Sequence, residues 1–185
     1  MLLSILSALA LVVNFMMLRP SWKPLRLGIA QRWEVLGGPI TWNGTVHELA
    51  TVEVHADCDG YMSVKTKYQV DEGAILVEFG GEVYDLSKHD SQPTNWFISI
   101  IGFRGDYVLD GAMRGKWTFS RYLNEKKVGS FVNSSQRISG KNNYTDANAE
   151  IEWETCLSPY DFRAILRAKR MIPAGTEILW NYPWV

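Results

Sequence analysis

Short stretches of alternating apolar and polar residues follow one another from about residue 28 to the end of the chain. An alternation with a period of two places one set of side chains on each face of a strand, so these stretches predict β-strands. Turns between them are predicted at Asn43-Gly44, Asp71-Glu72-Gly73 and Pro173-Ala174-Gly175. The predicted strands lie within residues 33–49, 50–56, 61–70, 74–86, 96–111 and 176–182.

Two further segments, 149–157 and 162–172, alternate in the same way and predict a hairpin with its turn at Ser158-Pro159. Helical periodicity is rare by comparison. The segment 117–127 predicts a short helix, and Gly129 follows it at a place where glycine commonly ends a helix. The whole pattern predicts a mainly β domain with few short helices and long irregular loops.

The N-terminus departs from this pattern. Residues 2–18 are almost wholly apolar, and these 17 residues lie near the short limit of a membrane span. Basic residues from Arg19 onward would then leave the downstream domain facing the cytoplasm. The alternatives are a buried or interfacial helix, or an incorrectly assigned start of translation. We therefore divide the chain into an apolar segment with its linker, 1–26, and a domain, 27–185.

Composition and charge exclude a few classes of function but do not indicate a particular one. The 185 residues, 46% of them apolar, suit one domain with a packed core. A net charge of −1 gives no sign of direct nucleic-acid binding, which needs a clustered basic surface. The two cysteines, Cys58 and Cys156, form no CxxC pair, so no Cys-rich zinc site is expected. No metal ligands are assigned, and a disulfide between the cysteines is possible but not required.

Three separate segments carry short motifs. Each motif is weak alone, but their order along the chain is informative. The first, residues 60–86, has a strand, an acidic-Gly turn and a strand ending in Gly-Glu-Val. The second is GSFVNSS at 129–135, followed by DANAEIEW at 146–153, and the third is AILRAKRMIPAGTEILWNYPW at 164–184. Together they resemble the SET domain of protein lysine methyltransferases, with its patterns G-x-G-x-x-A, F-x-N-H-S … P-N-A and A-x-R-x-I-x-x-G-E-E-L-x-x-x-Y. The resemblance covers about residues 50–185.

The resemblance implies a fold and a reaction. The fold is a SET-domain-like β-clip of small curved sheets with a pseudoknot, in which the C-terminal strand passes near Asn133. The implied cofactor is S-adenosylmethionine, and the implied reaction is methyl transfer to a lysine of a histone or other protein or peptide. The family implies a nuclear or cytoplasmic location, unless residues 2–18 anchor the chain in a membrane. The motifs do not encode the substrate or the oligomeric state.

The resemblance also implies cofactor-binding positions. Asn133 is expected to hold the backbone and the cofactor where the chain crosses itself, and Ser134 to offer backbone groups to the adenine. Arg121 is a candidate for a charge-assisted bond to the cofactor carboxylate, or a solvated surface arginine. The first loop, where little side-chain bulk is tolerated, corresponds to Gly60, Tyr61 and Met62.

Methyl transfer requires a neutral amine aligned with the methyl group in a dry channel. Tyr182 matches the family's catalytic tyrosine, and Tyr122 is a candidate second one. Phe131 and Trp180, with Tyr182, are candidates for the walls of the substrate channel; the first two could instead fill the core.

Four positions depart from the family patterns. Met62 replaces a glycine, Ser134 a histidine, Ala147 a proline and Asn181 an aspartate. The departures motivate the first of two alternatives that stay open. One is a catalytically impaired SET-like binding module, and the other is an unrelated β-rich interaction domain held at a membrane by residues 2–18.

Overall fold

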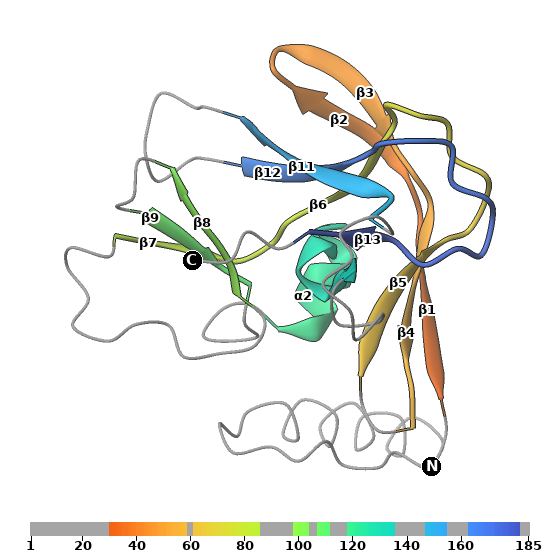
Figure 1. The fold of residues 1–185 in the computed structure, drawn as a ribbon. Helices are drawn as coiled ribbons and strands as arrows, with labels where there is room; N and C mark the ends of the chain where they lie inside the picture. Colours follow the sequence, from red (N-terminus) through yellow and green to blue (C-terminus); the bar gives the residue numbers. More distant parts are fainter. Residues whose placement is uncertain are drawn as a thin grey trace.

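The structure of the chain, a computed structural model, is mainly β, with three curled sheets and the helix α2 between them (Figure 1). It describes residues 30–58, 61–85, 98–103, 107–111, 118–135, 147–154 and 163–181. The predicted fold class, mainly β with small curved sheets, is confirmed.

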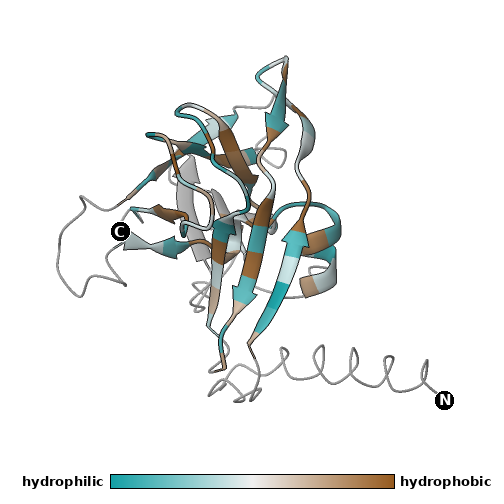
Figure 2. Cartoon of the chain, turned by 90° about the vertical axis from the view of Figure 1, so that its right-hand side faces the viewer, coloured by the Kyte–Doolittle hydropathy of each residue, from teal (hydrophilic) through white to brown (hydrophobic). Residues whose placement is uncertain are grey.

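Alternation along the chain builds the first sheet, in which β4 (Val52–Ala56) lies between β1 (Gln31–Val35) and β5 (Met62–Thr66). All its strand pairs are antiparallel. Val52 and Val54 are buried on the inner face, and Figure 2 shows the resulting hydrophilic and hydrophobic bands along the strands.

The second sheet holds seven strands, and one of them contains the cofactor candidates Asn133 and Ser134. Its order is β10-β13-β11-β12-β6-β3-β2, and the predicted hairpin is confirmed as the antiparallel pair of β11 and β12. A third sheet has the order β7-β9-β8. The second sheet consists of β2 (Gly38–Trp42), β3 (Thr45–Leu49), β6 (Ile75–Glu78), β10 (Asn133–Ser134), β11 (Ala149–Glu154), β12 (Arg163–Ala168) and β13 (Leu179–Trp180). The third consists of β7 (Glu82–Asp85), β8 (Ile98–Phe103) and β9 (Tyr107–Asp110).

The turns predicted at Asn43-Gly44, Asp71-Glu72-Gly73 and Pro173-Ala174-Gly175 are present. The turn predicted at Ser158-Pro159 lies outside the described residues. Asn43 and Gly44 both have positive φ, +48° and +76°, as a two-residue hairpin turn between β2 and β3 requires. Gly73 and Gly175 have φ of +81° and +75°, a region in which other residues are strained. These turns set the register of the strands on either side.

The predicted helix at 117–127 is present as α2 (Phe119–Asn124), shorter than predicted. Thr118 caps it, because its side chain accepts a hydrogen bond from a backbone N–H of the first turn. Phe119 and Tyr122 point from α2 into the main apolar core.

The prediction that Gly129 ends this helix is wrong. The helix ends at Asn124, and Lys126 takes the left-handed conformation, φ +59°, that glycine usually supplies at a helix end. Gly129 instead opens the 3₁₀ turn Gly129–Phe131, where a Cβ atom would lie 3.0 Å from the Glu78 carbonyl oxygen. Glycine is therefore needed there for close packing against β6.

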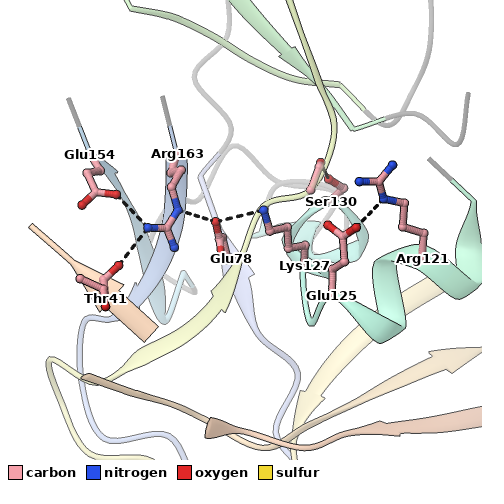
Figure 3. Close-up of polar contacts among 9 residues, drawn as sticks. Thr41, Glu78, Arg121, Glu125, Lys127, Ser130, Glu154 and Arg163 are labelled. Atoms are coloured by element: carbon pink, nitrogen blue, oxygen red, sulfur yellow. Dashed lines mark hydrogen bonds and ion pairs between the residues drawn. The ribbon is translucent and has the colours of Figure 1, made fainter. Parts of the chain in front are cut away.

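A buried carboxylate joins three elements at one side of the seven-stranded sheet (Figure 3). Glu78 is 5% exposed, and its Oε1 accepts a hydrogen bond from Arg163 Nε at 2.8 Å, with Lys127 Nζ at 3.6 Å. The same guanidinium donates to Glu154 at 3.0 Å and to the Thr41 carbonyl oxygen at 2.9 Å. Burying Glu78 is tolerable only because these cations compensate its charge.

Trp42 attaches the β2–β3 hairpin to the same network. The guanidinium of Arg163 lies 5.6 Å from the centre of the Trp42 ring, and the indole N–H donates to Glu152 at 2.7 Å. The hydrogen bond with Glu78 raises the pKa of Arg163, so this side chain stays charged.

Residues 1–29, with the predicted apolar segment 2–18, lie outside the described residues. Within the described part of the chain, no helix is long and apolar enough to cross a membrane. Cys156 also lies outside it, and the exposed thiol of Cys58 is free.

Replacing Arg163 by alanine should lower the free energy of unfolding by about 2–3 kcal/mol, because Glu78 loses its closest cation while remaining buried. Arg167→Ala is the matched control on the same strand, since its partner Glu152 is more exposed (34% against 7% for the side chain of Glu78). Arg167→Ala should lower the free energy of unfolding by about 1 kcal/mol. Urea titrations of both variants measure the difference, and equal costs would contradict the role given to Glu78.

Glu53 makes folding pH-dependent. Burial raises the pKa of this carboxyl, but hydrogen bonds from Lys67 and His55 and the charge of Arg32 outweigh it and lower the pKa from 4.5. The stabilisation is therefore present above about pH 4.5 and is lost as the pH falls through the lower pKa of the folded state. In melting experiments from pH 7 to 3, Glu53→Gln should lose stability less steeply below pH 4.5 than the unaltered chain. If the melting temperatures of the two proteins fell equally steeply below pH 4.5, this account would be contradicted.

Candidate functional site

The Asn133 strand and the C-terminal strand lie side by side, although they are far apart in sequence. β10 pairs in parallel with β13, with Asn133 opposite Leu179 and Ser134 opposite Trp180. β13 also pairs in parallel with β11 through Ala149 and Trp180. The C-terminal strand thus lies between the strands on either side of the 135–148 segment, and its predicted proximity to Asn133 is confirmed.

The side-chain amide of Asn133 joins three segments. Its Nδ2 donates to the Met62 carbonyl oxygen and to Glu177 Oε1, each at 2.9 Å. Met62 begins β5, and Glu177 lies just before β13. These three residues define what we call the Asn133 junction. It brings together one residue from each of the three motif segments of the sequence.

Asn148 holds the C-terminal strand from the other side, a role that the sequence did not reveal. Its Nδ2 donates to the Glu177 carbonyl oxygen at 2.8 Å, and its Oδ1 accepts from the Leu179 N–H at 2.9 Å. Its backbone N–H donates to the Leu179 carbonyl oxygen at 3.0 Å. The side chain therefore imitates a peptide group of a neighbouring strand. The motif gave its position, but only these long-range bonds give its role.

Small and aromatic side chains surround the junction. Ser134 and Trp180, neighbours across the β10–β13 pair, are 4% and 2% exposed. The Trp180 ring stands edge-on to Phe79 with centroids 5.6 Å apart. Phe131 is also buried, and its ring lies 5.1 Å from that of Tyr122. Phe131 and Trp180 are thus core residues as well as channel candidates.

Two candidates are engaged in local contacts. Tyr122 is fully buried, and its hydroxyl donates to the Gly111 carbonyl oxygen at 2.8 Å. Arg121 forms an i,i+4 ion pair with Glu125 on the surface of α2. Both contacts are of the kind expected of structural residues, and the catalytic and cofactor roles of these two side chains stay predictions.

The first loop is described in part. Tyr61 is 52% exposed, and its backbone N–H donates to Asp57 Oδ1 at 2.9 Å. Met62 is buried and paired with Ala56. Gly60 and Tyr182 lie outside the described residues. Among the described residues, no group of His, Cys, Asp and Glu could hold a metal ion.

Comparison with known proteins adds evidence on the fold. No family model matches the chain, and no curated protein sequence matches it. Among solved structures, it is similar to KRYPTONITE, a SET-domain histone methyltransferase crystallised with mCHH DNA, an H3(1-15) peptide and SAH. The TM-score is 0.51 and the identity 15%, over 74% of this chain and 24% of that one.

The fold resembles a SET domain. At 15% identity the likeness concerns the fold alone, and the matched region is about a quarter of the length of KRYPTONITE. The chain therefore has a methyltransferase-like fold. The departures at Ser134 and Asn181 are accommodated within it, because Ser134 is buried between strands and Asn181 Oδ1 accepts a hydrogen bond from Ser135 at 2.6 Å.

Asn133→Ala should lower the free energy of unfolding by about 1–3 kcal/mol, because the Met62 carbonyl oxygen and the half-buried Glu177 carboxylate lose a shared donor. Asn133→Asp keeps the size of the side chain but places a second carboxylate beside that of Glu177. At pH 8 it should therefore lower the free energy of unfolding more than Asn133→Ala does. Thermal unfolding of both variants tests this order. An unchanged melting temperature in Asn133→Ala would contradict the role of the junction.

Proposed function

We propose that this chain transfers a methyl group from S-adenosylmethionine to a lysine amine of a histone, another protein or a peptide. The observation that supports this most is the Asn133 junction, where one side chain connects β5, β10 and the segment entering β13. The SET-like fold supports it as well, since KRYPTONITE was crystallised with SAH and an H3 peptide.

The residues at the junction fit a cationic cofactor. The stretches 131–135 and 178–182 contain apolar and neutral polar side chains and no Lys or Arg, and Glu177 is the nearby carboxylate. A sulfonium cation is compatible with aromatic rings, oxygen atoms and one carboxylate, and it would be repelled by a cluster of basic groups. In this proposal residues 60–62, Asn133 and Ser134 hold the cofactor, which supplies the methyl group.

The protein's part in the reaction is to orient a neutral amine and exclude water. A free lysine has a pKa near 10.4, so the site must favour the uncharged form. Desolvation and a nearby positive charge both lower the pKa of an amine. Trp180 would contribute a dry aromatic wall, and the hydroxyl of Tyr182 would orient the amine.

A catalytically impaired binding module is the second candidate. It is favoured by the environment of Tyr122, whose hydroxyl is bonded to a core carbonyl oxygen. It is also favoured by the four departures from the family patterns. Such a module would bind the cofactor or a peptide without turnover.

Binding is tested by melting the full chain with and without S-adenosylmethionine or its demethylated product. A ligand at about 100 times its dissociation constant should add about 2.7 kcal/mol, a shift of several degrees for a chain of this size. Asn133→Ala is the control and should show a smaller shift. Absence of any shift at millimolar ligand would overturn the proposed function.

Replacing Tyr182 by phenylalanine removes one hydroxyl and should reduce methyl transfer at least about 100-fold, in the range seen when one positioned polar group is lost. The cofactor-induced shift in melting temperature should remain. Transfer of radiolabelled methyl groups to histone H3 peptides and other lysine peptides measures the rate. Equal rates in both proteins would refute the catalytic assignment, and binding without transfer by the unaltered chain would favour the binding module.

A further inference from the structure

Strand β1 forms one edge of the β1-β4-β5 sheet (Figure 1). Within the part of the chain that the structure describes, it pairs with β4 alone. Its inner side is anchored, because the Trp33 ring lies edge-on to that of Phe119 in α2, with centroids 4.7 Å apart. An edge strand is a template for pairing with a strand of another chain. The side chains of β1 indicate which strand it fits.

The exposed side chains of this edge follow a simple pattern. Every second residue from 30 to 36 is exposed, whereas the residues between them are half-buried or buried. We call the exposed residues the β1 row: Ala30, Arg32, Glu34 and Leu36. Leu36 is 65% exposed, and the side chains of Arg32 and Glu34 are 63% and 42% exposed. The row is therefore apolar, basic, acidic and apolar in chain order.

We propose that β1 pairs with β1 of a second copy of this chain, antiparallel and about a two-fold axis, so that two three-stranded sheets become one continuous sheet. Residues directly opposite each other in such a pair lie on the same face of the sheet. Centring the pair on Trp33 places Arg32 opposite Glu34 of the second copy, and the symmetry repeats this contact. Leu36 then lies opposite Ala30 of the second copy. The β1 row is thus complementary to itself.

Only this register satisfies both charges among those that overlap over most of β1. Shifting the pair while keeping the row on one face moves its centre to Arg32 or to Glu34. Either shift sets a charged side chain directly opposite its own copy, and like charges in that position destabilise a strand pair. The order of the two charges therefore selects one arrangement of the two copies.

The contacts of these two side chains within the chain leave them able to bond across the edge. Arg32 Nη1 lies 3.7 Å from Glu53 Oε2, and Glu34 Oε2 lies 3.6 Å from Lys67 Nζ. Both distances exceed those of a close charge-assisted hydrogen bond, and both side chains reach solvent. The inference concerns assembly and does not depend on methyl transfer.

Sedimentation velocity of the full chain at low ionic strength and rising concentration tests the proposal, and the mass of two chains is expected. Arg32→Glu sets carboxylates opposite each other in the dimer, and Glu34→Arg does the same with guanidinium groups. Each exchange should weaken association at least about tenfold. Glu48→Arg, the same charge change at an exposed position of β3, should leave it unchanged.

Mixing separates a lost contact from a lost fold. An equimolar mixture of Arg32→Glu and Glu34→Arg should associate again, because an acidic row then meets a basic one. The double variant that carries both exchanges should associate with itself for the same reason. A single chain mass at every concentration, association that neither single exchange weakens, or a mixture that stays dissociated would each overturn the proposal.

Discussion

The side-chain nitrogen of Asn133 donates to acceptors on two other segments, and much of the structure depends on satisfying both at once. An acceptor that loses its donor in a partly buried place costs about 1–3 kcal/mol, so this amide stabilises the approach of the start of β5 and of the segment before β13. Met62 and Glu177 are 115 residues apart in the numbering, yet one side chain fixes their separation. The crossing of the chain at this point follows from that requirement, and the proposed cofactor residues lie around it.

The C-terminal strand, β13, is also held by a few side-chain hydrogen bonds. Two residues of strand cannot hold a segment by backbone pairing alone, and side-chain amides and a hydroxyl complete the pairing. Asn148 acts as a substitute peptide group on one side of β13, and Asn133 and Ser135 bond to the side chains of Glu177 and Asn181, which flank the strand. Neutral polar groups suit this task because they form strong bonds in a buried place without the cost of desolvating a charge. They also leave the region compatible with a cationic ligand.

Local patterns in the sequence were enough to predict the mainly β class, the strands other than the two-residue β10, and the described turns, because alternation and positive-φ residues such as Asn43-Gly44 act over a few residues. Features fixed by distant contacts were not predictable. Lys126 takes a glycine-like conformation at the end of α2, where its Nζ bonds to the Gly37 carbonyl oxygen. Glu78 is buried within a strand because cations from two other elements surround it. Motif order located the candidate site, whereas the role of Asn148 required its long-range partners.

The position of β13 between β10 and β11 has a consequence for how the protein is made. Both partners of this strand leave the ribosome before it does, and they cannot complete their pairing until it emerges. Contacts of such long sequence separation slow folding, because the loops they close are costly in entropy. The apolar interior of a nascent chain would therefore stay incompletely covered until β13 emerges.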